Sequence, residues 1–261
     1  MADKFAIITG ASTGIGFELA QLAVDDGYDL LVVADEPLID AAAADFRRNG
    51  ADVQSAEADL ATVEGVDRLL AAANGRRIDL LCANAGIGTG GAFLDQSVTK
   101  WRHSIDTNIT GTLYLLQKVL KDMVAKGEGK VLVTGSIAGY VPGSFNAVYN
   151  GTKAFVDNFT EALRNELKDV EGVTLTTLMP GATETEFFNR AGMDDTKVGT
   201  EKKADPAKVA KDGWDAMMAR KSAIVSGLMN KLQVAAAGVV PQSMLAESHR
   251  RMAEPGTGDD A

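Results

Sequence analysis

The chain has few cysteine, histidine and aromatic residues. These low counts argue against disulfides, a histidine metal site and an aromatic core, respectively. Cys82 is the single cysteine in 261 residues, so no intramolecular disulfide is possible and a reducing compartment is expected. The two histidines, His103 and His249, lack a metal-ligand spacing, so we predict no metal site and expect both to be structural or solvated. Aromatic residues make up 6% of the chain against 46% hydrophobic residues, which predicts an aliphatic core.

Long apolar runs and an excess of positive charge are also missing. No stretch approaches the roughly 20 apolar residues that span a bilayer, and residues 1–9 run directly into a strand with no visible signal peptide. Asp and Glu outnumber Lys and Arg by 36 to 26, which gives a formal net charge of −10. This charge argues against nucleic acid and membranes as partners. We therefore expect a cytoplasmic protein.

Apolar strand patterns alternate with amphipathic helical patterns along the chain. Strands are predicted at 5–9, 30–34, 52–58, 78–83, 131–134, 175–179 and 223–226. Helices are predicted at 15–25, 39–49, 63–73, 101–123, 147–168 and 206–219, with a short one near 244–252. Repeated strand–helix units predict an α/β protein with a single-domain Rossmann fold, in which a seven-stranded, mostly parallel sheet carries helices on both faces.

The chain shows no internal boundary. No linker divides it, so we expect one Rossmann-type domain over residues 1–253. The segment 182–206 is polar and irregular, and a loop of this length is typical of a functional lid at a substrate site. The tail 254–261 (EPGTGDDA) is expected to be disordered.

A serine, a tyrosine and a lysine are predicted to converge. Ser136 follows the strand 131–134, at the end where open α/β sheets bind ligands, and Tyr149 and Lys153 lie on one face of the next helix. A free tyrosine has a pKa of about 10, and a neighbouring ammonium lowers it toward the working pH. Such a site moves a proton to or from an oxygen on carbon. The pair alone also fits an ordinary polar helix surface.

A glycine-rich loop joins the first strand to the first helix. Gly10, Gly14 and Gly16 permit a tight turn and bring the helix N-terminus against a pyrophosphate. Asp35 ends the second strand 19 residues after Gly16, close to the ~20 expected for a ribose-binding acid. A second glycine run at 86–91 (GIGTGG) matches G-x-G-x-x-G, but no helix opens at its last glycine, so we interpret it as a loop beside the nicotinamide site.

Together these motifs resemble those of the short-chain dehydrogenase/reductase superfamily, over roughly residues 4–230. The motifs are TGASTGIG at 9–16, NAG at 84–86, Ser136, and Tyr-x-x-x-Lys at 149–153. The resemblance implies hydride transfer between a nicotinamide cofactor and a ketone or secondary alcohol. In it Tyr149 would be the general acid/base, Lys153 would lower the pKa of Tyr149 and bind the nicotinamide ribose, and Ser136 would orient the substrate oxygen. The implied catalytic residues are Asn108, within a proton relay, Ser136, Tyr149 and Lys153.

The resemblance also implies a cofactor site. Its residues would be Gly10, Ser12, Thr13, Gly14, Ile15, Gly16, Asp35, Asp59, Leu60, Asn84, Ala85, Gly86, Tyr149, Lys153, Pro180, Gly181, Thr183 and Thr185. We expect NAD(H) over NADP(H), because the Asp35 carboxylate accepts hydrogen bonds from a ribose and repels a 2′-phosphate. Thr13 stands where NADP-preferring relatives often carry a cation. A basic residue from elsewhere stays open, with Arg47 and Arg48 as candidates.

Two other functions share these features. A catalytically silent dinucleotide sensor would be favoured by loss of Tyr149 or Lys153, but both are present. The other is a double-bond reductase on the same fold, which the resemblance associates with a wider tyrosine–lysine spacing. The four-residue spacing of Tyr149 and Lys153 therefore argues against it. The predicted substrate is therefore a small carbonyl or alcohol, bound by three elements. These are 88–97, 138–146 and 182–206, which carry Phe93, Leu94, Val141, Phe145, Phe187 and Phe188.

A homodimer or homotetramer is expected. The helices at 101–123 and 147–168 carry more apolar positions than one sheet face needs, and the family commonly pairs them across a two-fold axis. The apolar positions include Leu113, Leu116, Leu120, Phe155 and Phe159.

Overall fold

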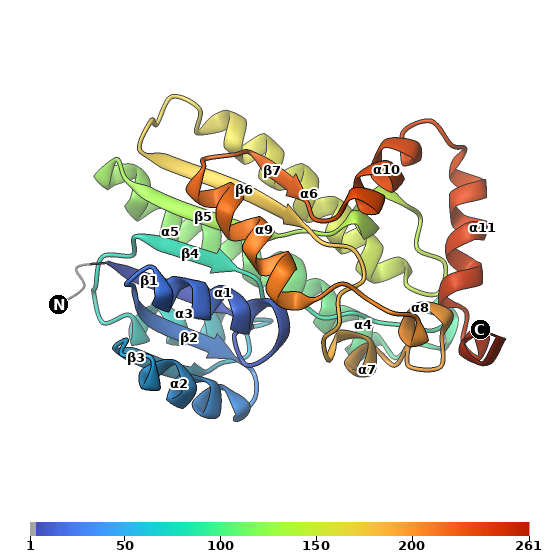
Figure 1. Ribbon diagram of the computed structural model, residues 1–261, viewed down its shortest axis with the longest axis horizontal. Coiled ribbons are helices and arrows are strands. Elements are labelled where there is room, and N and C mark those ends of the chain that lie inside the picture. The colour runs from blue at the N-terminus through green and yellow to red at the C-terminus, as the bar shows by residue number, and fades with distance from the viewer. Residues whose placement is uncertain (1–3, 261) are drawn as a thin grey trace.

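A single twisted sheet runs through the molecule, with helices on both sides (Figure 1). The computed structural model describes residues 4–260, so the first three residues of the predicted domain and the last of the predicted tail lie outside the described range. The strands are β1 (Phe5–Thr9), β2 (Asp29–Ala34), β3 (Val53–Glu57), β4 (Leu80–Ala83), β5 (Gly129–Thr134), β6 (Val173–Met179) and β7 (Ala223–Val225). Every pairing is parallel, in the order β3-β2-β1-β4-β5-β6-β7. The predicted seven-stranded Rossmann-type sheet is confirmed.

The helices complete three layers. They are α1 (Gly14–Asp25), α2 (Leu38–Arg48), α3 (Val63–Ala72), α4 (Val98–Ile105), α5 (Thr112–Lys126), α6 (Ala147–Glu166), α7 (Phe187–Ala191), α8 (Lys197–Thr200), α9 (Pro206–Met218), α10 (Leu228–Ala237) and α11 (Gln242–Ala253). No helix among residues 4–260 is long and apolar enough to cross a bilayer. The inner strands β1, β2 and β4 are apolar on both faces because helices cover both.

Alternation along the strands divides the core in two. Ile8 and Val32 are buried in the cluster with α1, α2 and α9. Ile7 and Val33, the sequence neighbours of these two residues, point to the other face and are buried in the cluster with α3, α5 and α6. The strand order reverses between β1 and β4, so the loops after these strands diverge and leave space at the carboxyl ends of the sheet.

The prediction of one continuous α-helix over 101–123 is wrong. The structure has α4, then a π-helical segment at Asp106–Gly111, then α5. Gly111 packs against the Leu60 carbonyl so closely that a Cβ would overlap it, and the Asn108 side chain bonds the backbone of Ile87. Both constraints come from distant segments, and a π-bulge of this kind accommodates them.

The segment 182–206 has more structure than predicted. It contains α7 and α8, and its two ends pair in a bridge between Thr183 and Ala204. Its buried Ala191 and Met193 form a separate small cluster with Ala253 of α11. This segment, for which the sequence predicted a lid, is therefore packed against the end of the chain.

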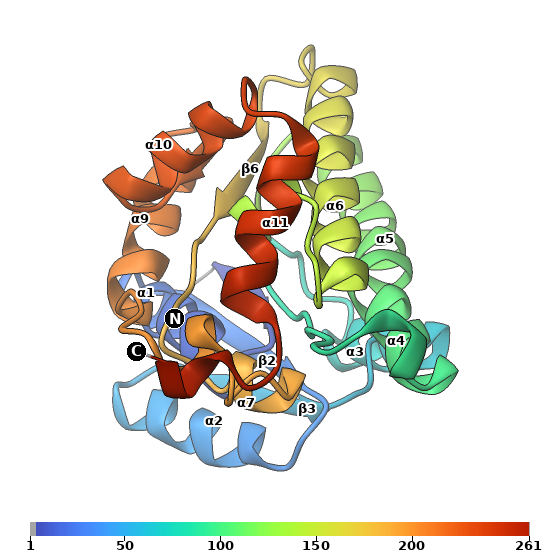
Figure 2. The same ribbon diagram turned by 90° about the vertical axis from the view of Figure 1, so that its right-hand side faces the viewer.

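The expectation of a disordered tail is wrong for residues 254–260. Thr257–Asp260 form a 3₁₀ turn, and the Gly258 N–H donates to the Asp195 carbonyl over 2.8 Å. The Thr257 hydroxyl accepts from the Lys197 N–H over 3.0 Å. Figure 2 shows α11 descending to this turn, which lies beside α8 in Figure 1. Composition predicted disorder, but these contacts with the lid order the backbone.

Candidate active site

The turn after β1 has no room for a side chain at any of its three glycine positions. Gly10 and Gly14 have φ of +65° and +58°, and a Cβ on Gly10 would lie 2.9 Å from the Ala85 Cα. A Cβ on Gly14 would lie 2.7 Å from a methyl carbon of Thr185, and one on Gly16 would overlap the Gly10 carbonyl. The α1 N-terminus has neither a capping side chain nor an acid in its first turn. Its free N–H groups can therefore bind an anionic group.

Hydrogen bonds join the ends of three strands beside this turn. The Thr9 hydroxyl accepts from the N–H groups of Asn84 and Ala85 over 2.9 and 3.0 Å. The Asn84 amide donates to the Thr9 carbonyl over 3.2 Å and accepts from the Thr134 hydroxyl over 3.0 Å. Asn84 thus holds β1, β4 and β5 in register at the edge that faces the cavity.

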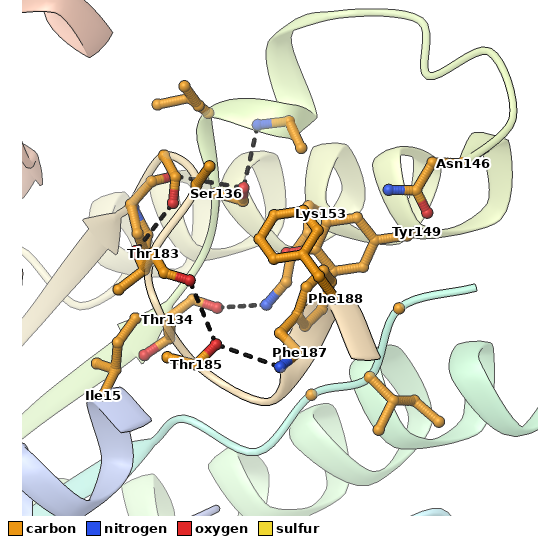
Figure 3. Close-up of a pocket in the computed structure, with 18 of the residues that line it drawn as sticks. Ile15, Thr134, Ser136, Asn146, Tyr149, Lys153, Thr183, Thr185, Phe187 and Phe188 are labelled. Atoms are coloured by element: carbon orange, nitrogen blue, oxygen red, sulfur yellow. Dashed lines mark hydrogen bonds between the residues drawn. The ribbon is translucent and has the colours of Figure 1, made fainter. Parts of the chain in front are cut away.

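The predicted serine, tyrosine and lysine meet on one cavity wall (Figure 3). Lys153 Nζ donates to the Thr134 carbonyl over 2.7 Å and lies 5.8 Å from the centre of the Tyr149 ring. The Ser136 hydroxyl accepts from the Ala138 N–H over 3.1 Å and donates to the Pro180 carbonyl over 3.4 Å. The cavity has a volume of about 720 Å³ and continues to the glycine turn. Such a cavity can hold a dinucleotide and a small molecule together.

The pKa of Tyr149 is raised, whereas the sequence predicted that Lys153 would lower it. The Phe187 ring packs on Tyr149 with centroids 4.8 Å apart. Desolvation raises the Tyr149 pKa to about 12, although Ser136 acts to lower it and Asp157 adds to the rise. Burial also lowers the Lys153 pKa from its ordinary value. In this arrangement the loss of water around the phenol outweighs the lowering effect of the Ser136 hydroxyl on the Tyr149 pKa.

Asn108 supports the site from behind the cavity wall. Its amide oxygen accepts from the Ile87 N–H over 2.9 Å, and its nitrogen donates to the Ile87 carbonyl over 2.9 Å. The same nitrogen donates to the Thr152 hydroxyl over 2.9 Å, which connects the π-helical segment to α6. Gly86 lies between Asn108 and Lys153, because a Cβ on it would lie 3.2 Å from the Asn108 oxygen and 3.5 Å from Lys153 Nζ.

The structure brings nearly all the predicted site residues to the cavity. Gly16 and Asn108 are the two predicted residues that the cavity wall does not include. The wall includes Gly10, Ser12, Thr13, Gly14, Ile15, Asp35, Asp59, Leu60, Asn84, Ala85, Gly86, Ser136, Tyr149, Lys153, Pro180, Gly181, Thr183 and Thr185.

The sequence did not reveal an ion pair that joins the lid to the end of β2. Arg190 of α7 lines the cavity, and its Nη2 lies 2.8 and 3.1 Å from the two Glu36 carboxylate oxygens. The Ser12 hydroxyl donates to the same carboxylate over 2.6 Å. Burial acts to raise the Glu36 pKa, but these two partners together lower it. No local signal pairs residues separated by so much chain.

The two cations proposed from the sequence lie elsewhere. Arg47 Nε donates to the Val53 carbonyl over 2.8 Å, and Arg48 pairs with Asp45 over 2.7 Å. Neither belongs to the cavity wall that the described residues form. Arg190, not Arg47 or Arg48, is the arginine in that wall.

The part of the cavity where the sequence predicted a substrate differs partly from expectation. Val141, Phe187 and Phe188 line it, but Phe93 and Leu94 are 52% and 93% exposed and lie outside its wall. Phe145 packs in the small cluster beneath the lid. The helices α10 and α11 supply wall residues that the sequence pattern did not assign to a site, among them Val234, Leu245, Ser248, His249 and Met252.

His249 is structural, as expected. Its Nδ1 lies 2.9 Å from the Ser144 carbonyl, so this nitrogen carries the proton, and Nε2 lies 3.5 Å from the Asn150 amide nitrogen. Burial lowers the His249 pKa, which favours this neutral form. The contact fixes α11 against the loop before α6. Among the described residues no group of three or more His, Cys, Asp or Glu is arranged to hold a metal ion.

Comparison with known proteins agrees with this geometry. A family model described as short chain dehydrogenase matches residues 4–196. An uncharacterized oxidoreductase from Staphylococcus saprophyticus is 31% identical over 214 residues, which are 80% of this chain and 89% of that protein.

Solved structures of the same fold contain nicotinamide cofactors. A short-chain dehydrogenase from Sphingobium yanoikuyae in complex with NADPH is 27% identical, with a TM-score of 0.80 over 92% of this chain and 97% of that one. A short chain dehydrogenase/reductase from Burkholderia phymatum in complex with NAD is 23% identical, with a TM-score of 0.81 over 89% and 92% of the two chains.

Removing the Phe187 ring should lower the Tyr149 pKa. We expect Phe187→Ala to readmit water to the phenol, so that the Tyr149 pKa falls from about 12 toward the ordinary value of about 10. Carbon-13 NMR of ring-labelled tyrosine measures the midpoint, and Tyr149→Phe assigns the signal. Phe155→Ala, on the exposed side of α6, is the control and should leave it unchanged. An unaltered midpoint in Phe187→Ala would show that the ring does not cause the shift.

Proposed function

Because the chain belongs to the short-chain dehydrogenase family of oxidoreductases, we propose that it transfers a hydride between a nicotinamide cofactor and a ketone or secondary alcohol. The observation that carries the proposal is the meeting of Ser136, Tyr149 and Lys153 on the wall of a cavity that continues to the glycine turn. A dinucleotide placed along that cavity would bring its reactive ring to these three side chains.

The residues present fit a nicotinamide dinucleotide. The free N–H groups at the α1 N-terminus suit its pyrophosphate, and the close approaches at Gly10 and Gly14 leave its path clear. Asp35, which is exposed on the cavity wall, suits the adenosine ribose. When bound, the nicotinamide ring supplies or accepts the hydride.

Proton transfer is the task of the chain's own side chains. The Ser136 hydroxyl would hold the substrate oxygen, and the Tyr149 hydroxyl would give that oxygen a proton in reduction or take one in oxidation. The Lys153 ammonium, anchored on the Thr134 carbonyl, would stabilise the phenolate that forms. Phe187 would exclude water from the reacting atoms.

A catalytically silent dinucleotide sensor is the alternative. It shares the fold and the glycine turn, but it gives no reason for a tyrosine and a lysine to share the cavity wall with Ser136. Turnover of any ketone or alcohol, detected as a change in nicotinamide absorbance at 340 nm, separates the two functions. A screen of both substrate classes with both cofactors is the direct experiment.

NAD(H) is the proposed cofactor. The Asp35 carboxylate at the end of β2 would accept hydrogen bonds from a ribose and repel a 2′-phosphate. Arg190 reaches the end of β2, but Glu36 already neutralises it. Solved structures of this fold contain either NADPH or NAD, so they do not favour one cofactor. The proposed preference for NAD(H) therefore rests on the charges of this chain alone.

We also propose a cytoplasmic homodimer or homotetramer. Leu116 and Leu120, which the sequence offered as contact residues, are buried in the core at 1% and 5% exposure and cannot contact a partner. Phe155 of α6 is 42% exposed and stacks on Phe159 with ring centroids 6.0 Å apart. An exposed aromatic ring on this helix, supported from below by the partly buried Phe159, supports a self-complementary interface there.

Loss of the Tyr149 hydroxyl should abolish most turnover. Tyr149→Phe keeps the ring and its packing on Phe187, so the fold and cofactor affinity should persist while kcat falls on the order of 10²–10⁴-fold. Steady-state kinetics and cofactor titration measure the two effects. Tyr114→Phe, which removes a hydroxyl bonded to Asp67 outside the cavity, is the matched control. Near-wild-type turnover in Tyr149→Phe would contradict the proposed mechanism.

Freeing Arg190 should weaken the discrimination against NADP(H). Glu36→Gln removes the charge that neutralises the guanidinium, so kcat/KM with NADP(H) relative to NAD(H) should rise on the order of tenfold, equivalent to about 1.4 kcal/mol. Adding Arg190→Met should reverse the gain. Glu128→Gln, near the opposite end of the sheet, is the control for charge. An unchanged cofactor ratio in Glu36→Gln would remove Arg190 from the explanation.

The α6 face should mediate assembly. Light scattering at micromolar concentration should give the mass of two or four chains, and Phe155→Glu should shift it toward one chain. Leu94→Glu is the control, because this exposed leucine lies outside α6. A monomeric mass for the wild-type protein would overturn this part of the proposal.

A further inference from the structure

Asp157 continues the row of reactive residues on α6. Tyr149, Lys153 and Asp157 are spaced four residues apart, so they lie one above another on the same face of the helix. Asp157 is set back from the cavity, whose described wall does not include it. It therefore cannot contact the substrate in this arrangement, and any part it plays must act through its neighbours.

The Asp157 carboxylate is buried without a hydrogen-bond partner. Both of its oxygens are inaccessible to solvent, and neither meets hydrogen-bond geometry with a donor among the described residues. The Ser136 backbone faces the carboxylate and acts to lower its pKa, but burial dominates and raises that pKa. A buried carboxylate costs free energy unless another charge compensates it. The burial of the Asp157 carboxylate is therefore expected to serve a function that offsets this cost.

The turn that carries Ser136 is shaped around this carboxylate. A Cβ on Gly135, the residue before Ser136, would overlap one Asp157 oxygen. A Cβ on Gly139, in the 3₁₀ turn Ile137–Tyr140, would lie 2.6 Å from the other oxygen. Glycines on both sides of the serine thus make the space that Asp157 occupies.

Few charges surround Asp157. On α6 itself Lys153 lies one turn before it and Glu161 one turn after it, while Tyr140 approaches from the 3₁₀ turn. No Lys, Arg or His of the described residues comes within 4.0 Å to form an ion pair with it. Lys153 is therefore the cation that its charge affects most.

We propose that Asp157 is a positioning residue, whose buried negative charge holds the Lys153 ammonium in its charged form beside Tyr149. The inference rests on the proposed function, in which Lys153 stabilises the Tyr149 phenolate. Burial lowers the Lys153 pKa, and Asp157 counters that fall. The same charge raises the Tyr149 pKa. Asp157 thus sets the pH range in which the pair can exchange a proton with substrate.

Removing the charge should move the pH profile to lower pH. In Asp157→Asn the phenolate meets less repulsion and the ammonium loses its support, so the pKa values of Tyr149 and Lys153 both fall. For alcohol oxidation, both limbs of the profile of kcat against pH should then shift to lower pH by about one pH unit. A purely structural loss would lower kcat at every pH without moving the limbs.

A matched variant controls for the change in helix charge. Glu161→Gln removes one negative charge from α6 one turn beyond Asp157, where the side chain is 63% exposed, and should leave the limbs in place. If Asp157→Asn does not fold, Asp157→Ser removes the same charge with a smaller side chain, and the result is read in the same way. Unmoved limbs in a folded, charge-free variant would overturn the inference.

A second measurement separates this inference from the proposed function. Carbon-13 NMR of ring-labelled tyrosine follows the Tyr149 titration without any substrate, and its midpoint should fall in Asp157→Asn. If Tyr149→Phe loses turnover while Asp157→Asn leaves the midpoint unchanged, only the positioning role fails. If Tyr149→Phe retains turnover, the proposed mechanism fails whatever the NMR result.

Discussion

The contact between the Lys153 ammonium and the Thr134 carbonyl is the interaction on which the site depends. It joins Lys153, four residues after Tyr149 on α6, to the last residue of β5. A buried ammonium needs such an acceptor, because desolvation otherwise drives it toward its neutral form. The carboxyl end of a parallel strand supplies the acceptor, and the helix after that strand returns the lysine to it.

Burial and charge act against each other throughout this site. Desolvation raises the Tyr149 pKa and lowers the Lys153 pKa. Burial thus favours the neutral form of both side chains and disfavours the phenolate and the ammonium. The opposing groups are local: the Ser136 hydroxyl acts on Tyr149, and the Asp157 carboxylate acts on Lys153. A buried tyrosine and lysine thus need neighbouring polar and charged groups to bring their pKa values back toward the ordinary range.

The segment 182–206 and the helices α10 and α11 near the end of the chain together form part of the cavity wall. Arg190 attaches α7 to Glu36 at the adenosine end, while Ala191 and Met193 pack on Ala253 of α11. The His249 imidazole fixes α11 to the loop before α6. Parts of the chain with weak sequence patterns therefore form much of the wall on the substrate side.

Local patterns in the sequence determined the fold and most of the cavity wall. Strand and helix periodicity predicted the seven-stranded sheet, and short-range spacing placed Tyr149 on the same helix face as Lys153, because both signals depend on neighbours within one or two turns. Only the tertiary structure decided the π-bulge at Asn108, the Glu36–Arg190 pair and the niche of Asp157. These arise where segments distant in the chain meet, and the tyrosine pKa depends on the same packing, since burial beneath Phe187 is a property of the folded cavity.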